Sequence, residues 1–475
     1  MTDQNKLQNL KTVLKKHGQS HILAFWDRLG PARQGRLLIQ INQLDFAQLN
    51  RWREEFVLNT SPFKLPDKLA PAPFYAHQPS DAGQRGKYDQ ARQLGDKLIS
   101  QGKVAAFVVA GGQGTRLGFD GPKGNFPISP VKNKTLFQIF AESISAAYKK
   151  YHTSCPWYIM TSPLNYQQTL DIFSANNYYG LSKNDVFIFQ QGTLPNFSLD
   201  GKILLSDIDT IATSPDGHGG SLRAIYNSGA MADMQKRGIE FVSYYQVDNP
   251  LINIFDPLFI GLHTLDGAEM SSKGLSKTGP FEKLGNFCLA DGKVTVIEYS
   301  DLPDELAEKR NPDGSLAFEL GSIAIHIISV NFIERLNKHG FVLPLHRAAK
   351  KIPYVDEEGR RVEPKEPNGV KLESFVFDAL PLAGKSIILQ TVRSEEFAPA
   401  KNATGVDSAQ TARQMMVDRA AVWLESAGVK VPRKADGSPD CIIEISPGFA
   451  LTREDVAEKR DKIPTIKPGD KIYLG

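Results

Sequence analysis

The sequence has few cysteines and no long apolar run, and both absences limit what the protein can be. Only three cysteines occur in 475 residues, at Cys155, Cys288 and Cys441. Their spacing matches no zinc site and is typical of a reducing compartment. No window approaches about 18 uninterrupted apolar residues, and the N-terminal residues lack the apolar core of a signal peptide. We therefore expect a cytoplasmic protein without a membrane-spanning segment.

An excess of either charge is also missing, since the formal net charge is only +3. A near-neutral chain gives no support to a nucleic-acid-binding role. A chain of this length is too long for one ordinary core, so two or three domains are expected. We predict a helical N-terminal region with a proline-rich connector over residues 1–95, a catalytic domain over 96–385, and a small C-terminal α+β domain over 386–475.

One glycine-rich stretch carries the strongest functional signal in the sequence. It follows residues 104–109, which are apolar and partly β-branched and therefore predict a buried parallel strand. Four glycines occur within the eight residues from Gly111 to Gly118, and such a turn leaves backbone N–H groups free to face an anion. Arg116 and Lys123 add positive charge. Together these features predict a site for the phosphates of a nucleotide.

The stretch matches neither of the two best-known phosphate-binding motifs. A P-loop needs a lysine and then serine or threonine directly after its last glycine, and no such pair follows Gly118. The dinucleotide-binding fingerprint needs glycine at the sixth position of a run that begins Gly112-x-Gly114, where Leu117 stands instead. Both P-loop ATP hydrolysis and NAD binding are therefore disfavoured.

Strand and helix patterns alternate after this stretch and predict the fold class. Strands are expected at 157–161, 186–190 and 241–247, and helices near 165–176 and 221–236. This alternation predicts a doubly wound α/β domain, with a mostly parallel sheet covered on both faces. Ligands bind such sheets at the carboxyl ends of the strands.

Three further loops follow strands of the same predicted sheet. Gln191 closes one strand, and its amide could read the edge of a base. Residues 215–220 form a second glycine-rich loop before a helix. Asp248 ends another strand, where a carboxylate could hold Mg²⁺ against phosphate. Taken singly, each has a simple structural explanation, but their recurrence after strands of one sheet predicts a shared site.

The glycine-rich stretch resembles the signature of nucleotide-sugar pyrophosphorylases, and most of all that of the eukaryotic-type UDP-N-acetylhexosamine enzymes. The matching residues are Ala110-Gly111-Gly112-Gln113-Gly114-Thr115-Arg116-Leu117-Gly118 and Pro122-Lys123-Gly124. Further segments resemble family segments in family order over nearly the whole chain: Trp157–Ser162, Phe189–Gly192, Pro215–Gly217, Val247–Asn249, Val296–Tyr299, Pro367–Lys371, Phe375–Asp378 and Lys401–Ala403.

The resemblance implies a nucleotide-sugar transferase fold, and transfer of a uridylyl group from UTP to a sugar 1-phosphate, in the first place N-acetylglucosamine 1-phosphate. Mg²⁺ is the implied cofactor, with Asp248 as its ligand. The implied catalytic cations are Arg116, Lys123 and Lys401. The implied nucleotide contacts are Ala110, Gly111, Gly112, Gln191, Gly217, Asp248 and Lys371. The implied sugar contacts are His218, Glu298, Tyr299 and Ser322.

These residue types suit the implied reaction. A sugar 1-phosphate is already anionic, so no general base is needed to create the nucleophile. What opposes the reaction is repulsion between two anions and the charge that builds on the leaving pyrophosphate. Positioned cations and a metal ion address both.

Two positions depart from the N-acetylhexosamine pattern. Those enzymes usually carry Asp-Gly-Asn-Gly-Gly where this chain has His218 in the central position, and Gly-Asn where this chain has Gly321-Ser322. A hydroxyl in place of an amide could remove a sugar hydrogen bond or admit a water. His218 could instead cap the following helix or remain hydrated. A UDP-glucose or broad UDP-sugar activity is therefore the main alternative.

Two other classes of function have less support. A nucleotide-sugar-binding protein without catalysis would be expected to have replaced at least one of Arg116, Lys123, Asp248 and Lys401. A helical scaffold is disfavoured because the N-terminal helical segment is too short to account for the sheet domain. The expected partners are the small molecules UTP and sugar 1-phosphate, with neither nucleic acid nor a membrane, and self-association is left open.

Overall fold

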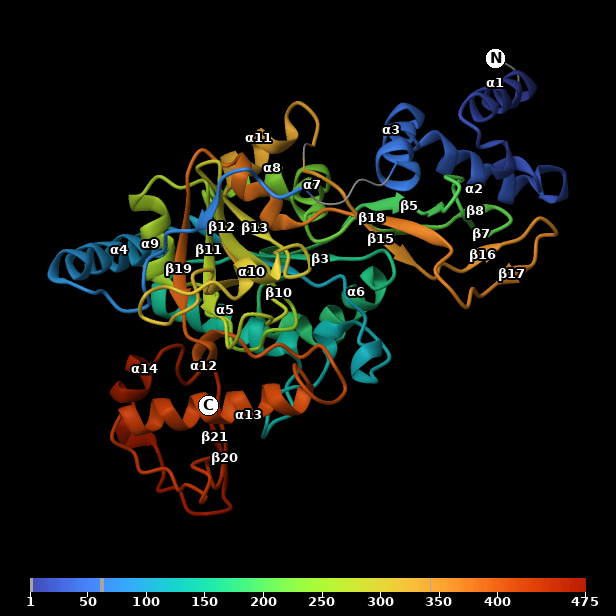
Figure 1. Cartoon of the computed structure of the whole chain (residues 1–475). Coiled ribbons are helices and arrows are strands. Elements are labelled where there is room, and N and C mark those ends of the chain that lie inside the picture. Colours follow the sequence, from blue (N-terminus) through green and yellow to red (C-terminus); the bar gives the residue numbers. More distant parts are fainter. Residues whose placement is uncertain (1–2, 60–63, 342) are drawn as a thin grey trace. The chain divides into compact units, whose positions relative to one another are not determined.

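The computed structural model describes residues 3–59, 64–341 and 343–475, and the chain divides into two compact units (Figure 1). Unit 1 combines Met1–Lys64, Gly192–Gly220 and Leu343–Val376. Unit 2 combines Leu65–Gln191, Ser221–Val342 and Phe377–Gly475. The domain boundaries predicted at residues 95 and 385 stay predictions.

Unit 2 is built on a ten-stranded sheet with a parallel block of four strands. These strands pair in the order β10 (Phe241–Gln246), β2 (Val104–Val109), β3 (Trp157–Thr161) and β4 (Val186–Gln190). Every residue of β2 and β3 is buried, which explains why both segments are continuous apolar runs. The doubly wound α/β class predicted from the sequence is confirmed.

Antiparallel strands extend the sheet beyond β10, and the alternating pattern did not predict them. β14 (Leu320–Ser329) pairs with β10 and with β11 (Met270–Ser276). Its register shifts between Ser272 and Gly274, where a bulge that contains Ala324 at φ 54° lies opposite the single residue Lys273. The remaining strands of the sheet are β1 (Leu69–Pro71), β12 (Asn286–Ala290), β13 (Lys293–Ile297) and β19 (Ser386–Thr391).

β1 belongs to the proline-rich connector that was predicted within residues 1–95. It pairs antiparallel with β12, so this part of the segment is extended along the sheet. Residues 61–63 of that segment lie outside the described residues.

Helices α4 (Ala82–Ser100) and α9 (Pro257–Leu265) of unit 2 lie side by side (Figure 1). They approach closely because each presents a glycine, and a Cβ on Gly95 would lie only 1.9 Å from the carbonyl oxygen of Pro257. The other helices of unit 2 before residue 400 are α5 (Leu136–Tyr151), α6 (Tyr166–Ala175), α7 (Gly220–Asn227), α8 (Ala230–Arg237), α10 (Asp304–Ala307), α11 (Val330–Asn337) and α12 (Arg393–Glu396).

The single helix predicted at 221–236 is wrong in one respect, because the segment forms two helices, α7 and α8. They are separated at Gly229, whose φ of 89° lies in the left-handed region and cannot continue an α-helix. Within the described residues, no helix combines the length and apolar character needed to cross a membrane.

The C-terminal residues of unit 2 have a small apolar core of their own. It contains Trp423 and Leu424 of α13, and the elements around it are α13 (Ala409–Ser426), β20 (Ile442–Ile445), α14 (Arg453–Glu458) and β21 (Lys471–Leu474). Glu444 of β20 accepts hydrogen bonds of 2.8 Å from the backbone N–H groups of Val131 and Lys132. The C-terminal part is therefore tied to the loop that precedes α5.

Unit 1 joins the N-terminal helices to short antiparallel strands. The helices are α1 (Asp3–Lys16), α2 (Pro31–Asn42) and α3 (Phe46–Trp52), and Asp45 caps α3 by accepting from the backbone N–H of Gln48. Arg33 of α2 donates to Asp209 at 2.7 Å, which fixes α2 to the strands. These strands are β5 (Thr193–Pro195), β6 (Phe197–Ser198), β7 (Leu205–Asp207), β8 (Thr210–Ile211), β9 (Thr213–Pro215), β15 (His346–Lys350), β16 (Tyr354–Val355), β17 (Arg361–Val362) and β18 (Gly369–Glu373).

Candidate active site

The glycine-rich stretch begins where β2 ends, at Ala110. Ala110 is buried, and its N–H donates to Met160 on β3 at 2.7 Å. The N–H groups of Gly111 and Gly112 donate to no acceptor among the residues that the structure describes. Two backbone donors at the carboxyl end of a parallel strand are suited to binding an anion.

Gln191 lies against Gly111, as expected for two neighbours at one edge of the sheet. A Cβ on Gly111 would lie 2.5 Å from Oε1 of Gln191, so only glycine leaves room for this amide. The Gln191 side chain is buried, and its backbone N–H donates to Thr161 of β3 at 2.8 Å.

Asn165 fixes the glycine-rich stretch, and the sequence analysis did not identify it as a site residue. Its Nδ2 donates to the carbonyl oxygens of Ala110 at 3.0 Å and Gly112 at 3.2 Å. Its Oδ1 accepts from the backbone N–H and the hydroxyl of Ser162. Because Asn165 holds the carbonyl groups on one side, the N–H groups of the stretch are directed away from it. Its position in the loop between β3 and α6, four residues after the end of β3, was the available signal.

Lys123 lies at the centre of the candidate site. Its backbone N–H donates to the carbonyl of Gly112 at 3.0 Å, so the two ends of the stretch are closed together. Its Nζ lies 3.9 Å from Oδ2 of Asp248, and its side chain is only 9% exposed. Burial lowers the pKa of Lys123, and the nearby charges of Arg116 and Lys401 lower it further, whereas Asp248 opposes the shift. The three predicted cations and the predicted metal ligand therefore act on one another electrostatically.

Arg116 and Lys401 differ from Lys123 in exposure. Arg116 lies in a short 3-10 turn at Thr115–Leu117 and is exposed. Lys401 is about 40% exposed on its side chain, and its Nζ lies 3.9 Å from Asp407. Both cations can therefore change rotamer to follow a ligand, whereas Lys123 is held in place.

The Asp248 carboxylate is the candidate protein ligand for Mg²⁺. Its distance of 3.9 Å from Lys123 is too long for a hydrogen bond, and its side chain is 15% exposed. Across the described ranges, no group of three or more His, Cys, Asp and Glu side chains could hold a metal ion. Mg²⁺ is commonly bound by one or two carboxylates together with substrate phosphates, so a single Asp248 fits this mode and no all-protein cage.

Two of the predicted sugar contacts surround Gly285. The backbone N–H of Ser322 on β14 donates to the Gly285 carbonyl at 2.7 Å. A Cβ on Gly285 would lie 3.3 Å from Oε1 of Glu298. The third, Tyr299, follows Glu298 and is exposed by 46%. The structure brings these residues of unit 2 to the antiparallel side of the sheet.

The remaining predicted residues, Gly217, His218 and Lys371, lie in unit 1. Gly217 has φ 85°, and a Cβ there would lie 2.3 Å from the carbonyl oxygen of Ser374, so only glycine fits. Lys371 lies on β18 and pairs with Ala348. The structure does not test the roles of the predicted contacts, which stay predictions.

His218 is neutral and fixed in orientation. Its Nδ1 accepts from the backbone N–H of Val376 at 3.1 Å, so the neutral ring carries its proton on Nε2. Phe375 stacks on His218 with ring centroids 5.2 Å apart. His346 stacks on the same Phe375 ring, with centroids 4.4 Å apart. Burial, together with the nearby charge of His346, lowers the pKa of His218 to about 4.

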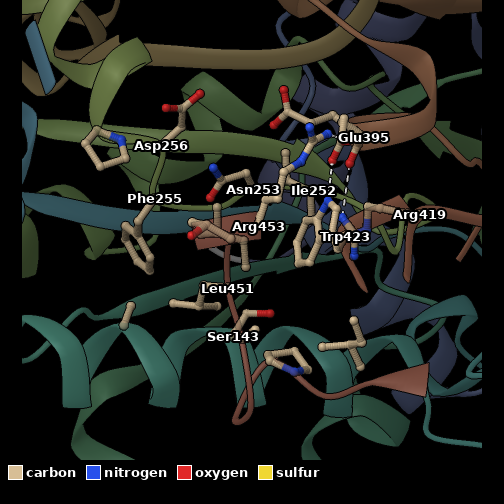
Figure 2. Close-up of a pocket in the computed structure, with 18 of the residues that line it drawn as sticks. Ser143, Ile252, Asn253, Phe255, Asp256, Glu395, Arg419, Trp423, Leu451 and Arg453 are labelled. Carbon is tan, nitrogen blue, oxygen red and sulfur yellow. Dashed lines mark hydrogen bonds and ion pairs between the residues drawn. The ribbon is translucent and has the colours of Figure 1, made fainter. Parts of the chain in front are cut away.

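A separate cavity of about 700 Å³ lies elsewhere in unit 2 (Figure 2). None of the predicted site residues lines it. Several of its charged side chains are paired within its wall: Arg453 donates to Glu395, and Lys273 lies within ion-pair distance of Asp256 and Glu396. We place the active site at the glycine-rich stretch because unpaired backbone donors and cations converge there.

Comparison with known proteins shows the family to which the chain belongs. A family model described as UTP–glucose-1-phosphate uridylyltransferase matches residues 77–474. The chain belongs to this family. The recognition made from the sequence is thereby confirmed, and the chain is a uridylyltransferase enzyme.

Individual relatives are similar over almost their whole length. The chain is 37% identical to the human UDP-N-acetylhexosamine pyrophosphorylase-like protein 1, over 94% of this chain and 93% of the relative. It is 36% identical to the Saccharomyces cerevisiae UDP-N-acetylglucosamine pyrophosphorylase, over 96% and 98%. The structure of the Trypanosoma brucei uridine diphosphate N-acetylglucosamine pyrophosphorylase, in complex with an inhibitor, superposes with a TM-score of 0.82 at 26% identity, over 100% of this chain and 98% of that one.

Proposed function

We propose that this uridylyltransferase makes UDP-N-acetylglucosamine and pyrophosphate from UTP and N-acetylglucosamine 1-phosphate. The observation that carries the proposal is the position of Lys123, which is buried between the free N–H groups of Gly111 and Gly112 and the carboxylate of Asp248. The names of the yeast and trypanosome relatives support this sugar.

The reaction follows from the chemistry of the groups that converge at this site. A phosphate oxygen of the sugar 1-phosphate attacks the α-phosphorus of UTP, the bond from that phosphorus to the bridging oxygen breaks, and pyrophosphate leaves. The residues of the chain orient two anions and stabilise the charge that develops, so no proton needs to move. Lys123 and the N–H groups of Gly111 and Gly112 bind the triphosphate, and Lys401 neutralises the attacking phosphate.

We propose Asp248 as the protein ligand of Mg²⁺. When bound, the ion would supply charge neutralisation at the phosphates of UTP. The support is the single carboxylate at the end of β10, which is near Lys123 and too far from it for a hydrogen bond.

The direct test is to incubate the pure protein with Mg²⁺, UTP and one sugar 1-phosphate at a time, and to measure pyrophosphate release. Glucose, galactose, N-acetylglucosamine and N-acetylgalactosamine 1-phosphates form the substrate panel. We expect the highest kcat/KM with N-acetylglucosamine 1-phosphate. Release with none of the four sugars would contradict the proposal.

A second candidate is a UDP-glucose or broad UDP-sugar pyrophosphorylase. The observation that favours it is the pair His218 and Ser322, which stand where N-acetylhexosamine enzymes usually carry asparagine. A rate with glucose 1-phosphate within about a factor of ten of the rate with the N-acetyl sugar would support the broad activity. A substrate group that makes only apolar contacts or poor hydrogen bonds changes kcat/KM by only about 10–200-fold.

Two further properties are proposed with narrower support. A cytoplasmic location agrees with three cysteines that are all free and buried. Self-association remains a prediction, to be tested by the mass of the protein in solution.

A further inference from the structure

A buried lysine outside the proposed anion site joins three segments of unit 2. Lys273 lies on β11 and is 2% exposed. Its Nζ lies 2.7 Å from Asp256, just before α9, and 2.5 Å from both carboxylate oxygens of Glu396, at the end of α12. Burial disfavours the charge of this ammonium, but the two carboxylates more than offset it, so the pKa of Lys273 is raised.

Further polar contacts hold Glu396 itself. Thr391 donates its hydroxyl to Oε2 of Glu396 at 2.6 Å. Asn249 donates its Nδ2 to the main-chain carbonyl of Glu396 at 2.6 Å. The carboxylate and the main chain of this residue are therefore both fixed.

The segment that follows Glu396 is bound to the loop after β10. Oδ1 of Asn249 accepts from the backbone N–H of Ala398 at 3.0 Å. The N–H of Ala400 donates to the carbonyl of Asp248 at 2.9 Å. The next residue is Lys401. The position of its main chain relative to Asp248 is therefore set by the hydrogen bonds of Glu396, Ala398 and Ala400.

We propose that Lys273 and Asn249 are positioning residues, which hold the segment from Glu396 to Ala400 against the Asp248 loop and thereby place Lys401 beside Lys123. This inference rests on the proposed function only where it concerns the role of Lys401. Neither positioning residue needs to touch the substrate. The reach of Lys401 is set by its main chain, because its side chain is 40% exposed and its Nζ has two long contacts, with Asp407 at 3.9 Å and with the centroid of the Phe397 ring at 5.9 Å.

Stabilisation of the fold is the simpler explanation for the buried Lys273 and its two carboxylate partners. The position of these residues indicates that stability is not their whole role. Burying a lysine and two carboxylates costs about as much free energy as their pairing returns, and apolar replacements are often as stable. Here the buried charges and the Asn249 amide converge on one short segment, and that segment ends at a proposed catalytic cation. Fixed polar networks specify one geometry, which a phosphoryl-transfer site requires.

The test compares two neighbouring carboxylates that are changed in the same way. Glu396→Gln removes the charge that Lys273 holds and keeps the size of the side chain. Glu395→Gln is the matched control: both glutamates line the separate cavity, but the Glu395 carboxylate accepts from Arg453 and Trp423 and not from Lys273 (Figure 2). We expect Glu396→Gln to lower kcat at least about tenfold with little change in the KM for UTP, as for a misplaced reacting group, and Glu395→Gln to leave kcat nearly unchanged.

The Lys401→Ala background separates positioning from a general structural defect. If Glu396 acts through Lys401, Glu396→Gln has no further effect on kcat once Lys401 is gone, since coupled residues are not additive. Losses that multiply in the double variant would overturn the proposal. Thr391→Val, which removes only one hydroxyl, serves if Glu396→Gln does not fold, and it should lower kcat in the same direction.

Hydrogen exchange gives a readout that does not depend on activity. We expect the amides of Ala398 and Ala400 to exchange faster in Glu396→Gln and Asn249→Ala than in the unchanged protein, and to be unaffected in Glu395→Gln. Equal protection in all four proteins would refute the positioning role even if the enzyme is active. Conversely, an unchanged protein that releases no pyrophosphate would refute the proposed function, while the exchange rates would still show whether Glu396 and Asn249 hold the segment.

Discussion

Replacing Lys123 by alanine perturbs the residue on which the proposed chemistry depends most. The side chain of Lys123 is 9% exposed, and its backbone N–H donates to the carbonyl of Gly112, so the ammonium group is held in place. Its Nζ is 3.9 Å from Asp248, and it shares the local field of Arg116 and Lys401. The change removes one fixed positive charge from a site that must bring two anions together.

The expected magnitude follows from the geometry. At 3.9 Å and an effective dielectric constant of about 20, a pair of unit charges interacts by about 4 kcal/mol. A transition-state anion held at a similar distance would lose a comparable interaction, and removal of one such electrostatic group lowers kcat by about two to three orders of magnitude. We therefore expect Lys123→Ala to reduce kcat at least about a hundredfold.

Steady-state pyrophosphate release with UTP and N-acetylglucosamine 1-phosphate is the assay. Lys123→Met is the control for packing, because it keeps most of the side-chain volume without the charge, and it should lose as much kcat as the alanine variant. Thermal unfolding of all variants shows whether the fold is intact.

The pH profile adds a second measurement on the same residue. Because burial and neighbouring cations lower the pKa of Lys123, kcat/KM of the unchanged enzyme should fall at alkaline pH, below the ordinary lysine range. In Lys123→Arg this alkaline limb should move to higher pH, since guanidinium does not deprotonate. A kcat of Lys123→Ala within a few-fold of the unchanged enzyme would remove Lys123 from the mechanism.

Three other predictions follow from single contacts. Asn165→Asp places carboxylate oxygens against the carbonyl oxygens of Ala110 and Gly112, which lie 3.0 and 3.2 Å from the Asn165 amide nitrogen. The change should raise the KM for UTP about tenfold, as the loss of a hydrogen bond in a buried site does. An unchanged KM would contradict the positioning role of Asn165. Gly111→Ala forces Gln191 aside, because the new Cβ would lie 2.5 Å from its Oε1, and calorimetry should show weaker UTP binding. His218 has a pKa of about 4 in the fold, against 6.5 in the unfolded chain. The unfolded state therefore binds more protons between these pH values, and the free energy of unfolding should fall by up to about 3 kcal/mol as the pH drops from 6.5 to 4. Urea unfolding of the unchanged protein and of His218→Asn at pH 7 and 4.5 measures this fall.

The parallel centre of the fold could be predicted because its strands carry their burial in their own sequence. β2 is apolar throughout and β3 is almost so, with Thr161 as its last residue, and a helix with a clear apolar face, α5, separates them. β14 could not be predicted in the same way, since it pairs antiparallel with strands on both sides and contains a two-residue bulge at Ala324. The break between α7 and α8 depends on one glycine, Gly229, whose backbone conformation the periodicity of the segment does not reveal.

The cations of the site could be identified, whereas the residues that hold them could not. Lys123 belongs to the glycine-rich stretch that follows β2, and Asp248 comes just after β10, so their positions in the sequence suggest a ligand. Asn165 bonds to a residue 55 positions away, and Lys273 to one 123 positions away. A buried amide or lysine gives no sign in one sequence of which distant carbonyl or carboxylate it will meet. Lys273 offered one clue, because it is a charge inside the otherwise uncharged strand Met270–Ser276.

The electrostatics of the site explain why such support is needed. Burial and two neighbouring cations all disfavour the charge on Lys123, and one carboxylate only partly compensates. A fold selected for stability alone would let Lys401 move away, because like charges repel and its side chain is partly exposed. A triphosphate is attracted by the same cations that repel one another. Rigid attachment of the Lys401 segment therefore keeps the repelling charges together where the anion is proposed to bind.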